Sequence, residues 1–128
     1  MPTHILDASA VIALLNREPG EDRVRALVRT GNAGISTVNI SEVATKLVAR
    51  GARAAEAELQ CRSMGLDLVD ADAEIAFQAA ALLPATQSLG LSLGDRICLA
   101  TAMRCGVPAV TADRAWNGIQ GVPIEVIR

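Results

Sequence analysis

Four acidic side chains stand where a predicted strand ends or the next helix begins. They are Asp7, Glu42, Asp95 and Asp113. Because ligand sites of open α/β sheets lie beyond the carboxyl ends of the strands, we expect these acids to meet at one edge of a sheet. Carboxylates gathered there repel one another unless a cation lies among them, and their hard oxygen atoms suit Mg²⁺ or Mn²⁺. The pattern therefore predicts a divalent-cation site.

Each acid also has a simpler explanation. Asp7 precedes a predicted helix and is a suitable N-cap, and Glu42 suits the exposed start of a helix. Ser92 and Asp95 form an S-x-x-D pattern typical of a capping box, and Asp113 suits a turn or an N-cap. Capping explains any one of these acids, but it does not explain why all four follow strands of one sheet.

Short apolar runs that favour strands alternate with helical patterns along the whole chain. The predicted strands are Thr3–Asp7, Gly34–Thr37, Leu66–Val69, Val107–Thr111 and Pro123–Ile127. The predicted helices are Ala8–Asn16, Glu21–Arg29, a helix capped by Thr37 that ends near Arg50, another that ends at Met64, an alanine-rich helix from Asp72 to Leu83 stopped near Pro84, and Ser92–Cys105. Residues 87–94 are expected to form a loop. This alternation predicts one α/β domain over residues 1–128, with a mainly parallel sheet of four to five short strands and helices on both faces.

Length, composition and charge exclude several classes of protein. A chain of 128 residues is the size of one domain, and its 51% hydrophobic content is typical of a folded protein. Twelve basic and fourteen acidic side chains give a net charge of −2, which excludes nucleic-acid binding through bulk positive charge. No apolar stretch approaches the roughly 20 residues of a membrane helix, and no secretory signal is recognised, so we expect a cytoplasmic protein without a membrane partner.

Other catalytic motifs are absent. The three cysteines, Cys61, Cys98 and Cys105, form no C-x-x-C pair and are interpreted as small hydrophobic residues. No G-x-G-x-x-G or P-loop pattern is present, which argues against dinucleotide binding and P-loop nucleotide hydrolysis. The only histidine, His4, has no H-E-x-x-H or G-x-S-x-G context, so a zinc protease or serine hydrolase is also disfavoured.

Four sequence blocks together resemble a known family. Asp7-Ala8-Ser9, Ser41-Glu42-Val43, LGDRICLA at 93–100 and VTADRAW at 110–116 look like the motifs of a PIN-domain nuclease of the VapC toxin type. The resemblance extends from Thr3 to the C-terminus. It implies a metal-dependent endoribonuclease that acts as the toxin of a type II toxin–antitoxin pair, forms a homodimer and is silenced by a small antitoxin protein.

The resemblance also implies roles for individual residues. Asp7, Glu42, Asp95 and Asp113 match the acidic quartet of the family, and Ser9 and Thr111 match its hydroxyl positions near the metal. Bound Mg²⁺ or Mn²⁺ would support hydrolysis of a phosphodiester in single-stranded or looped RNA. Arg96 and Arg114 each follow an acid directly, so they either contact substrate phosphate or form local ion pairs. Ser9 has the simpler alternative of a serine at the start of a helix.

Two other functions are compatible with an acid after the first strand. A phosphoaspartyl phosphatase of the haloacid dehalogenase type starts similarly, but its pattern is D-x-D, and Ser9 replaces the second acid here. A non-catalytic module could use the acidic edge to hold a structural cation or a basic peptide. All four acids are present, which favours the nuclease. Breakdown of RNA by the purified protein would distinguish the nuclease from the non-catalytic module.

Overall fold

Five parallel strands form the centre of the computed structural model, which describes residues 1–128. The strands are β1 (His4–Leu6), β2 (Ala33–Ser36), β3 (Asp67–Val69), β4 (Ala109–Thr111) and β5 (Ile124–Val126). Their order in the sheet is β3-β2-β1-β4-β5, and every neighbouring pair is parallel. The predicted α/β fold is confirmed; β2 is shifted by one residue from its predicted range, and the other four predicted strands are present in a shortened form.

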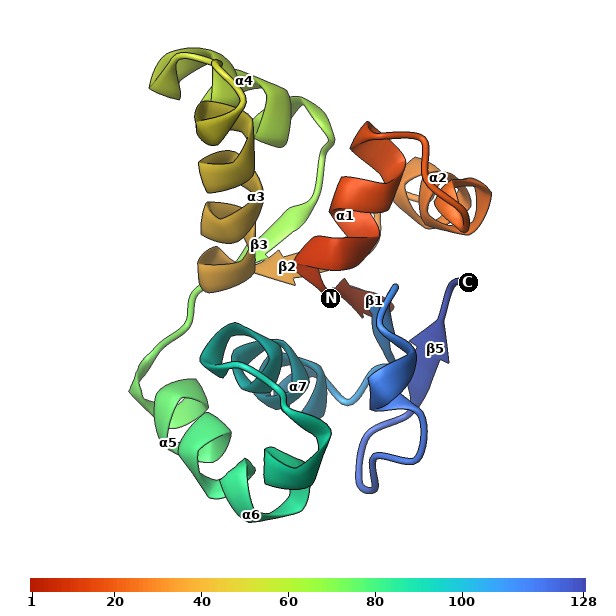
Figure 1. Cartoon of the computed structure of the whole chain (residues 1–128), viewed down its shortest axis with the longest axis vertical. Helices are drawn as coiled ribbons and strands as arrows, with labels where there is room; N and C mark the ends of the chain where they lie inside the picture. Colours follow the sequence, from red (N-terminus) through yellow and green to blue (C-terminus); the bar gives the residue numbers. More distant parts are fainter.

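Helices cover both faces of this sheet, as predicted. They are α1 (Ala8–Leu15), α2 (Glu21–Arg29), α3 (Thr37–Ala49), α4 (Ala54–Ser63), α5 (Ala73–Ala81), α6 (Leu83–Thr86) and α7 (Leu93–Cys105), with short 3₁₀ helices η1 (Gln87–Leu89) and η2 (Arg114–Trp116). Figure 1 shows α1 to α4 on one side of the sheet and α5 to α7 on the other. None of these helices combines the length and apolar character needed to cross a membrane.

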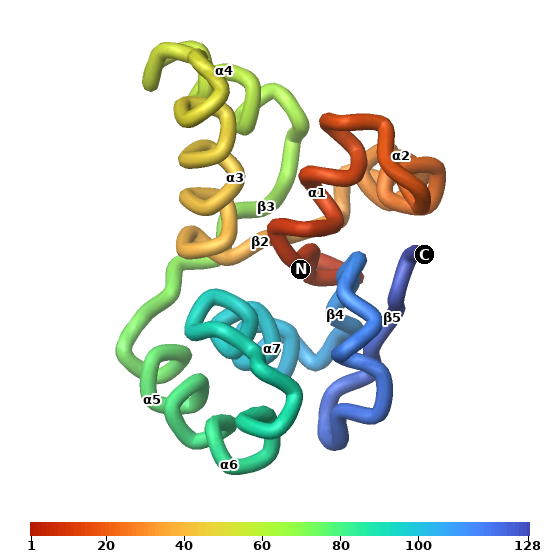
Figure 2. The backbone as a smooth tube through the Cα atoms, in the orientation of Figure 1, coloured from red at the N-terminus to blue at the C-terminus, as the bar shows by residue number.

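The core is divided between the two faces because successive strand residues point in opposite directions. Leu6 and its β4 neighbour Val110 pack into the cluster under α1, α2 and α3, whereas Ile5 and its neighbour Ala109 pack into the cluster under α7. Figure 2 shows how the late strand β4 returns beside the first part of the chain. The pairing of β1 with β4 thus brings the two ends of the sequence together in the middle of the sheet.

Most helix ends agree with the capping predictions. Asp72 accepts a hydrogen bond from the Ile75 N–H at the start of α5, and Ser92 and Asp95 form a complete capping box on α7. Gly106 ends α7 in the left-handed conformation (φ 67°), which glycine adopts at no steric cost. Local sequence signals therefore determined the start and end of α7, the helix that carries Asp95.

Two predicted boundaries are wrong. Ser36, not Thr37, caps α3, since its hydroxyl oxygen accepts the Asn39 N–H at 3.0 Å; the Thr37 hydroxyl instead accepts from the Ala71 N–H. Pro84 does not mark the end of the alanine-rich helix, because α5 already ends at Ala81 and Pro84 lies in the first turn of α6. Proline is tolerated there because the first turn needs no N–H donor. The expected loop after residue 86 also begins with η1.

Candidate functional site

The site lies where the order of the strands reverses. From β1 the chain adds β2 and β3 on one side and then crosses to add β4 and β5 on the other. The carboxyl ends of β1 and β4 are therefore neighbours, and open α/β sheets bind ligands beyond such a reversal. Asp7 directly follows β1, and Thr111 is the last residue of β4.

Asp7 is buried at this point, with only 4% of its surface exposed. Its Oδ2 accepts hydrogen bonds from the hydroxyls of Ser9 at 2.6 Å and Thr111 at 3.0 Å. These hydroxyl oxygens in turn accept backbone N–H groups, from Ala112 at 2.9 Å and Asp113 at 3.1 Å. Asp7 occupies the N-cap position of α1, as the simpler explanation expected, but its side chain makes no capping hydrogen bond to the helix.

Burial raises the pKa of Asp7 from 3.8 to about 6. The negative charge of Asp95 raises it further, whereas the hydrogen bonds from Ser9 and Thr111 oppose the rise because they stabilise the charged form. At neutral pH the carboxyl group of Asp7 is therefore charged in surroundings that destabilise its charged form. A cation beside Asp7 would stabilise the charged carboxylate.

Asp95 and Asp113 both take part in local caps. Asp95 Oδ2 accepts the Ser92 N–H at 2.9 Å, and Asp113 Oδ1 accepts the Ala115 N–H at 2.9 Å at the start of η2. The capping alternatives for these two residues are therefore correct as descriptions of their contacts. Each cap involves one carboxylate oxygen, which leaves the second oxygen of each acid without a hydrogen bond from the protein.

Glu42 lies on α3 and is held by a residue that the sequence analysis did not consider. The buried Asn39 donates from Nδ2 to Glu42 Oε1 at 2.7 Å and to the Gly94 carbonyl at 3.0 Å. Ser36, Asn39 and Glu42 are spaced three residues apart, so they share one face of the helix. That spacing was the available signal for Asn39.

The negative charges of three of the four acids act on one buried thiol, that of Cys98. The pKa of the Cys98 thiol is raised well above its usual value, first by complete burial and then by the negative charges of Asp7, Asp95 and Glu42. Asp7 directly follows β1, Glu42 lies on α3, and Asp95 lies in the first turn of α7. No three acidic, histidine or cysteine side chains converge closely enough to form a complete metal-binding cluster. Glu42 packs against Gly94, the residue before Asp95, but the acids do not form a closed ligand set.

Comparison with known proteins identifies this architecture. A family model described as "PIN domain" matches residues 4–121. The chain belongs to the PIN domain family. It is 36% identical over 103 residues to Ribonuclease VapC46 of Mycobacterium tuberculosis, a match that covers 80% of this chain and 75% of that protein. The predicted resemblance to VapC-type PIN domains is confirmed.

Solved structures have the same fold as this PIN domain. The VapBC complex of Salmonella typhimurium bound to DNA matches with a TM-score of 0.73 and 21% identity over 100% of both chains. VapC20 of Mycobacterium tuberculosis, described as a Sarcin-Ricin loop cleaving toxin, matches with a TM-score of 0.72 and 20% identity over 94% of this chain and 98% of that one. At such identities the likeness establishes the fold.

The two arginines beside the acids of this PIN domain form no ion pair with them. Arg96 donates from Nη1 to the Ala79 carbonyl of α5 at 3.0 Å, and Arg114 donates from Nε to the Arg128 carbonyl at 3.4 Å. The expectation of local ion pairs is therefore wrong for both. Arg96 is engaged in packing α7 on α5, whereas Arg114 is exposed next to Asp113.

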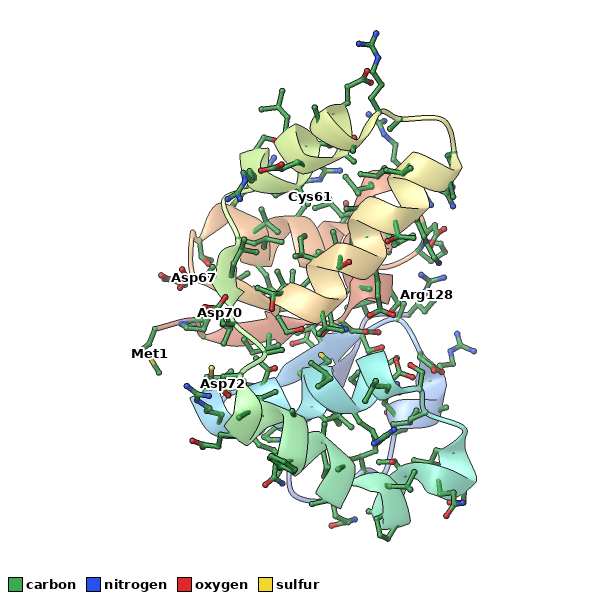
Figure 3. The ribbon with its side chains drawn as sticks, turned by 90° about the vertical axis from the view of Figure 1, so that its left-hand side faces the viewer. Met1, Cys61, Asp67, Asp70, Asp72 and Arg128 are labelled. Carbon is green, nitrogen blue, oxygen red and sulfur yellow. The ribbon has the colours of Figure 1, made fainter.

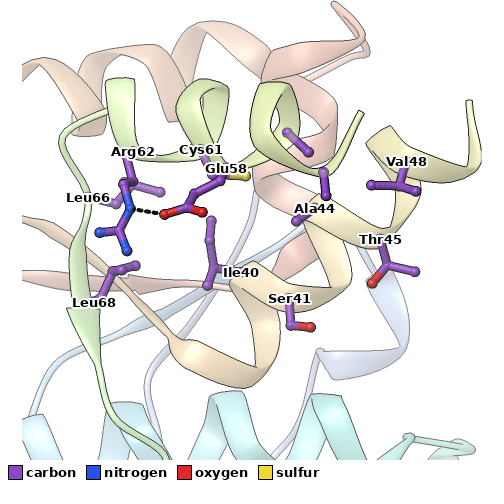
Figure 4. A pocket seen from close by; sticks show the side chains of 12 residues that line it. Ile40, Ser41, Ala44, Thr45, Val48, Glu58, Cys61, Arg62, Leu66 and Leu68 are labelled. Carbon is purple, nitrogen blue, oxygen red and sulfur yellow. Dashed lines mark hydrogen bonds and ion pairs between the residues drawn. The ribbon is translucent and has the colours of Figure 1, made fainter. Parts of the chain in front are cut away.

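A separate concavity of about 510 Å³ lies between α3 and α4 of the PIN domain (Figure 4). Its lining is mostly apolar, with Ile40, Leu66 and Leu68 among the lining residues, and the Glu58–Arg62 ion pair at 2.8 Å neutralises its charged groups. It offers no free acid and no nucleophile pair. None of the four candidate acids lines this concavity.

Further acids lie on β3 and on the link to α5: Asp67 begins β3, and Asp70 and Asp72 follow it (Figure 3). Asp72 is occupied by the cap of α5 and by an ion pair with Arg104 of α7, and these contacts lower its pKa. We therefore assign Asp72 to the structure of the α5–α7 pair rather than to the site.

Proposed function

We propose that this PIN domain is a divalent-cation-dependent endoribonuclease that acts as the toxin of a VapBC-type toxin–antitoxin pair. The observation that carries the proposal is the buried Asp7, whose carboxylate is held by the hydroxyls of Ser9 and Thr111 at the reversal of the strand order. Family membership and the relative named Ribonuclease VapC46 support it.

The donor set fits Mg²⁺ or Mn²⁺. It offers only hard carboxylate oxygens, and the strain on charged Asp7 favours a neighbouring cation. Asp7, Glu42 and Asp95 would hold the ion, and Asp113 would bind it directly or through water. A bound cation supplies an activated water, charge neutralisation on the phosphate and stabilisation of the leaving oxygen.

The protein groups contribute positioning and charge. Ser9 and Thr111 orient Asp7 through hydrogen bonds to a single oxygen, so the other oxygen has no side-chain donor and faces its ligand without competition from them. In this proposal Glu42 would hold or deprotonate a water molecule. Arg114, exposed beside Asp113, is the available cationic side chain for a substrate phosphate, whereas Arg96 is committed to α5.

The proposal includes partners and place of action. Solved structures of this fold include VapBC complexes, and we propose that a small antitoxin silences this chain and that the chain forms a homodimer. The proposed substrate is single-stranded or looped cellular RNA, which places the action in the cytoplasm.

The experiment is cleavage of a mixed pool of single-stranded and structured RNAs, and of total cellular RNA, by the purified antitoxin-free protein. Parallel reactions contain Mg²⁺, Mn²⁺ or EDTA, and Asp7→Asn is assayed beside the wild type. We expect cleavage only with the cation and with Asp7. Equal cleavage in EDTA, or by folded Asp7→Asn, would contradict the mechanism. No cleavage of either RNA sample by a cation-binding wild type would favour a non-catalytic binding module.

A further inference from the structure

Asn39 joins three parts of the molecule while being completely buried. Its Oδ1 accepts from the Ser36 hydroxyl at 2.7 Å at the end of β2, and its Nδ2 donates to Glu42 Oε1 at 2.7 Å and to the Gly94 carbonyl at 3.0 Å. The amide orientation follows from chemistry, because the carboxylate and the carbonyl are both acceptors and only the NH₂ group satisfies them. All the polar atoms of this side chain are therefore used.

Gly94 completes the arrangement from the first turn of α7. A Cβ atom at this position would lie 2.7 Å from Glu42 Oε1 and 2.8 Å from Oε2. The carboxylate of Glu42 thus rests directly against the Cα of Gly94, in space that any other residue would fill. Gly94 does not have a positive φ, so the need for glycine at this position is a need for space rather than for backbone freedom.

We propose that Asn39 and Gly94 form a latch that fixes the Glu42 carboxylate against the first turn of α7. Asn39 is then a positioning residue of the acid site, and Gly94 is the opening that admits Glu42. This inference rests on the proposed function, since it concerns the acid site of the proposed nuclease.

The latch matters because Glu42 is otherwise an exposed side chain with several rotatable bonds. A free glutamate samples many rotamers, and ordering it during the reaction would oppose catalysis. The latch orders the carboxylate beforehand. It also ties the acid of α3 to the residue next to Asp95, since Gly94 precedes Asp95 in α7.

Gly94→Ala is the sharpest test, because alanine favours a helix more than glycine does. We expect a protein no less stable than the wild type, with cleavage and Mn²⁺ affinity reduced about 10- to 100-fold because the carboxylate is displaced. Leu93→Ala, a change at the neighbouring exposed position of α7, is the matched control and should leave both unchanged. Full activity and full Mn²⁺ affinity in Gly94→Ala would overturn the proposal.

Asn39→Asp tests the other half of the latch. It keeps the shape of the side chain but replaces a donor with an acceptor that faces Glu42 and the Gly94 carbonyl. We expect Asn39→Asp to have lower thermal stability than the wild type. Adding Glu42→Gln should restore part of that stability, because the amide introduced at position 42 then donates to the carboxylate at position 39. Cleavage should stay lost in the double variant. Asn32→Asp, the same change on an exposed residue before β2, is the control.

The stability measurements separate this inference from the proposed function. If the wild type cleaves no RNA, the proposed function fails. Calorimetric Mn²⁺ titration and the stability of the double variant, Asn39→Asp with Glu42→Gln, still test the latch. If the wild type cleaves RNA but Glu42→Gln gives no rescue of Asn39→Asp, the Asn39–Glu42 contact does not position the acid and the latch is overturned.

Discussion

Asp7 and Thr111 are 104 positions apart in the sequence, yet the Thr111 hydroxyl donates a 3.0 Å hydrogen bond to Oδ2 of Asp7. The same hydroxyl oxygen accepts the Asp113 N–H at 3.1 Å. One side chain at the end of β4 therefore orients the buried acid of β1 and the backbone that leads to Asp113. The relationship depends on the parallel pairing of β1 with β4, which places both strand ends at the same edge.

Thr111→Val should reduce RNA cleavage about 10- to 100-fold, because valine has nearly the same shape but cannot orient Asp7. Loss of a donor to the charged carboxylate also raises the pKa of Asp7, so the decline in activity at acidic pH should begin at a higher pH. The pH–rate profile measures this shift. Thr111→Ser keeps the hydroxyl and should retain the wild-type profile; an unchanged profile in Thr111→Val would contradict the role of Thr111.

Asp7→Asn should abolish cleavage and at the same time stabilise the protein at neutral pH in EDTA. The folded-state pKa of Asp7 is raised from 3.8 to about 6, so the native state binds this proton more tightly than the unfolded chain does. The wild type therefore loses stability as pH rises from about 4 through 6, by about 3 kcal/mol in total.

Denaturant unfolding of both proteins between pH 3 and pH 8, roughly the range that spans both pKa values, measures this effect. The difference between Asp7→Asn and the wild type should be largest above pH 6 and smallest below the ordinary pKa of 3.8. If the difference in unfolding free energy between the two proteins were the same at every pH, the pKa of Asp7 would not be raised in the folded state.

Gly20→Ala should destabilise the fold without lowering cleavage. Gly20 has a φ of 95°, and a Cβ there would lie 2.6 Å from the Ile127 carbonyl oxygen. We expect a loss of more than about 1–2 kcal/mol, because backbone strain and the collision act together. Gly51→Ala is the matched control, since Gly51 also has a positive φ but faces open space. Equal losses in the two variants would exclude a contribution from the collision.

Ser92→Ala should remove about 1 kcal/mol of stability, because the Asp95 N–H loses its capping partner at 3.2 Å. Fraying of the first turn of α7 would also loosen Asp95 and Gly94, so cleavage should fall together with protection of the α7 amides in hydrogen exchange. Ser92→Asn retains a capping oxygen and should restore both properties. Reduced stability with unchanged cleavage would mean that the cap does not position Asp95.

Local patterns in the sequence were sufficient to predict the fold and to select the four candidate acids. Apolar runs with β-branched residues predicted all five strands, and the capping box at Ser92 predicted the start of α7, because such signals act within a few residues. The four acids were found because the carboxyl ends of parallel strands meet at one edge. Local patterns did not select the cap of α3 correctly, because Ser36 and Thr37 are adjacent hydroxyl residues. Ser36 makes the cap, so α3 begins one residue earlier than a cap at Thr37 would give.

The tertiary structure alone decided which distant residues hold and surround the acids. Asn39 reaches Gly94 across 55 positions of the chain, Thr111 reaches Asp7 across 104, and Arg96 turns toward α5 instead of the acids. None of these contacts follows from local periodicity, because each depends on two elements that only sheet pairing and helix packing bring together. The sequence by itself therefore determined the fold, the candidate acids and the local caps that hold Asp95 and Asp113, because those signals act within a few residues. Packing of the elements determined the contacts between distant residues, from Thr111 to Asp7 and from Asn39 to Gly94.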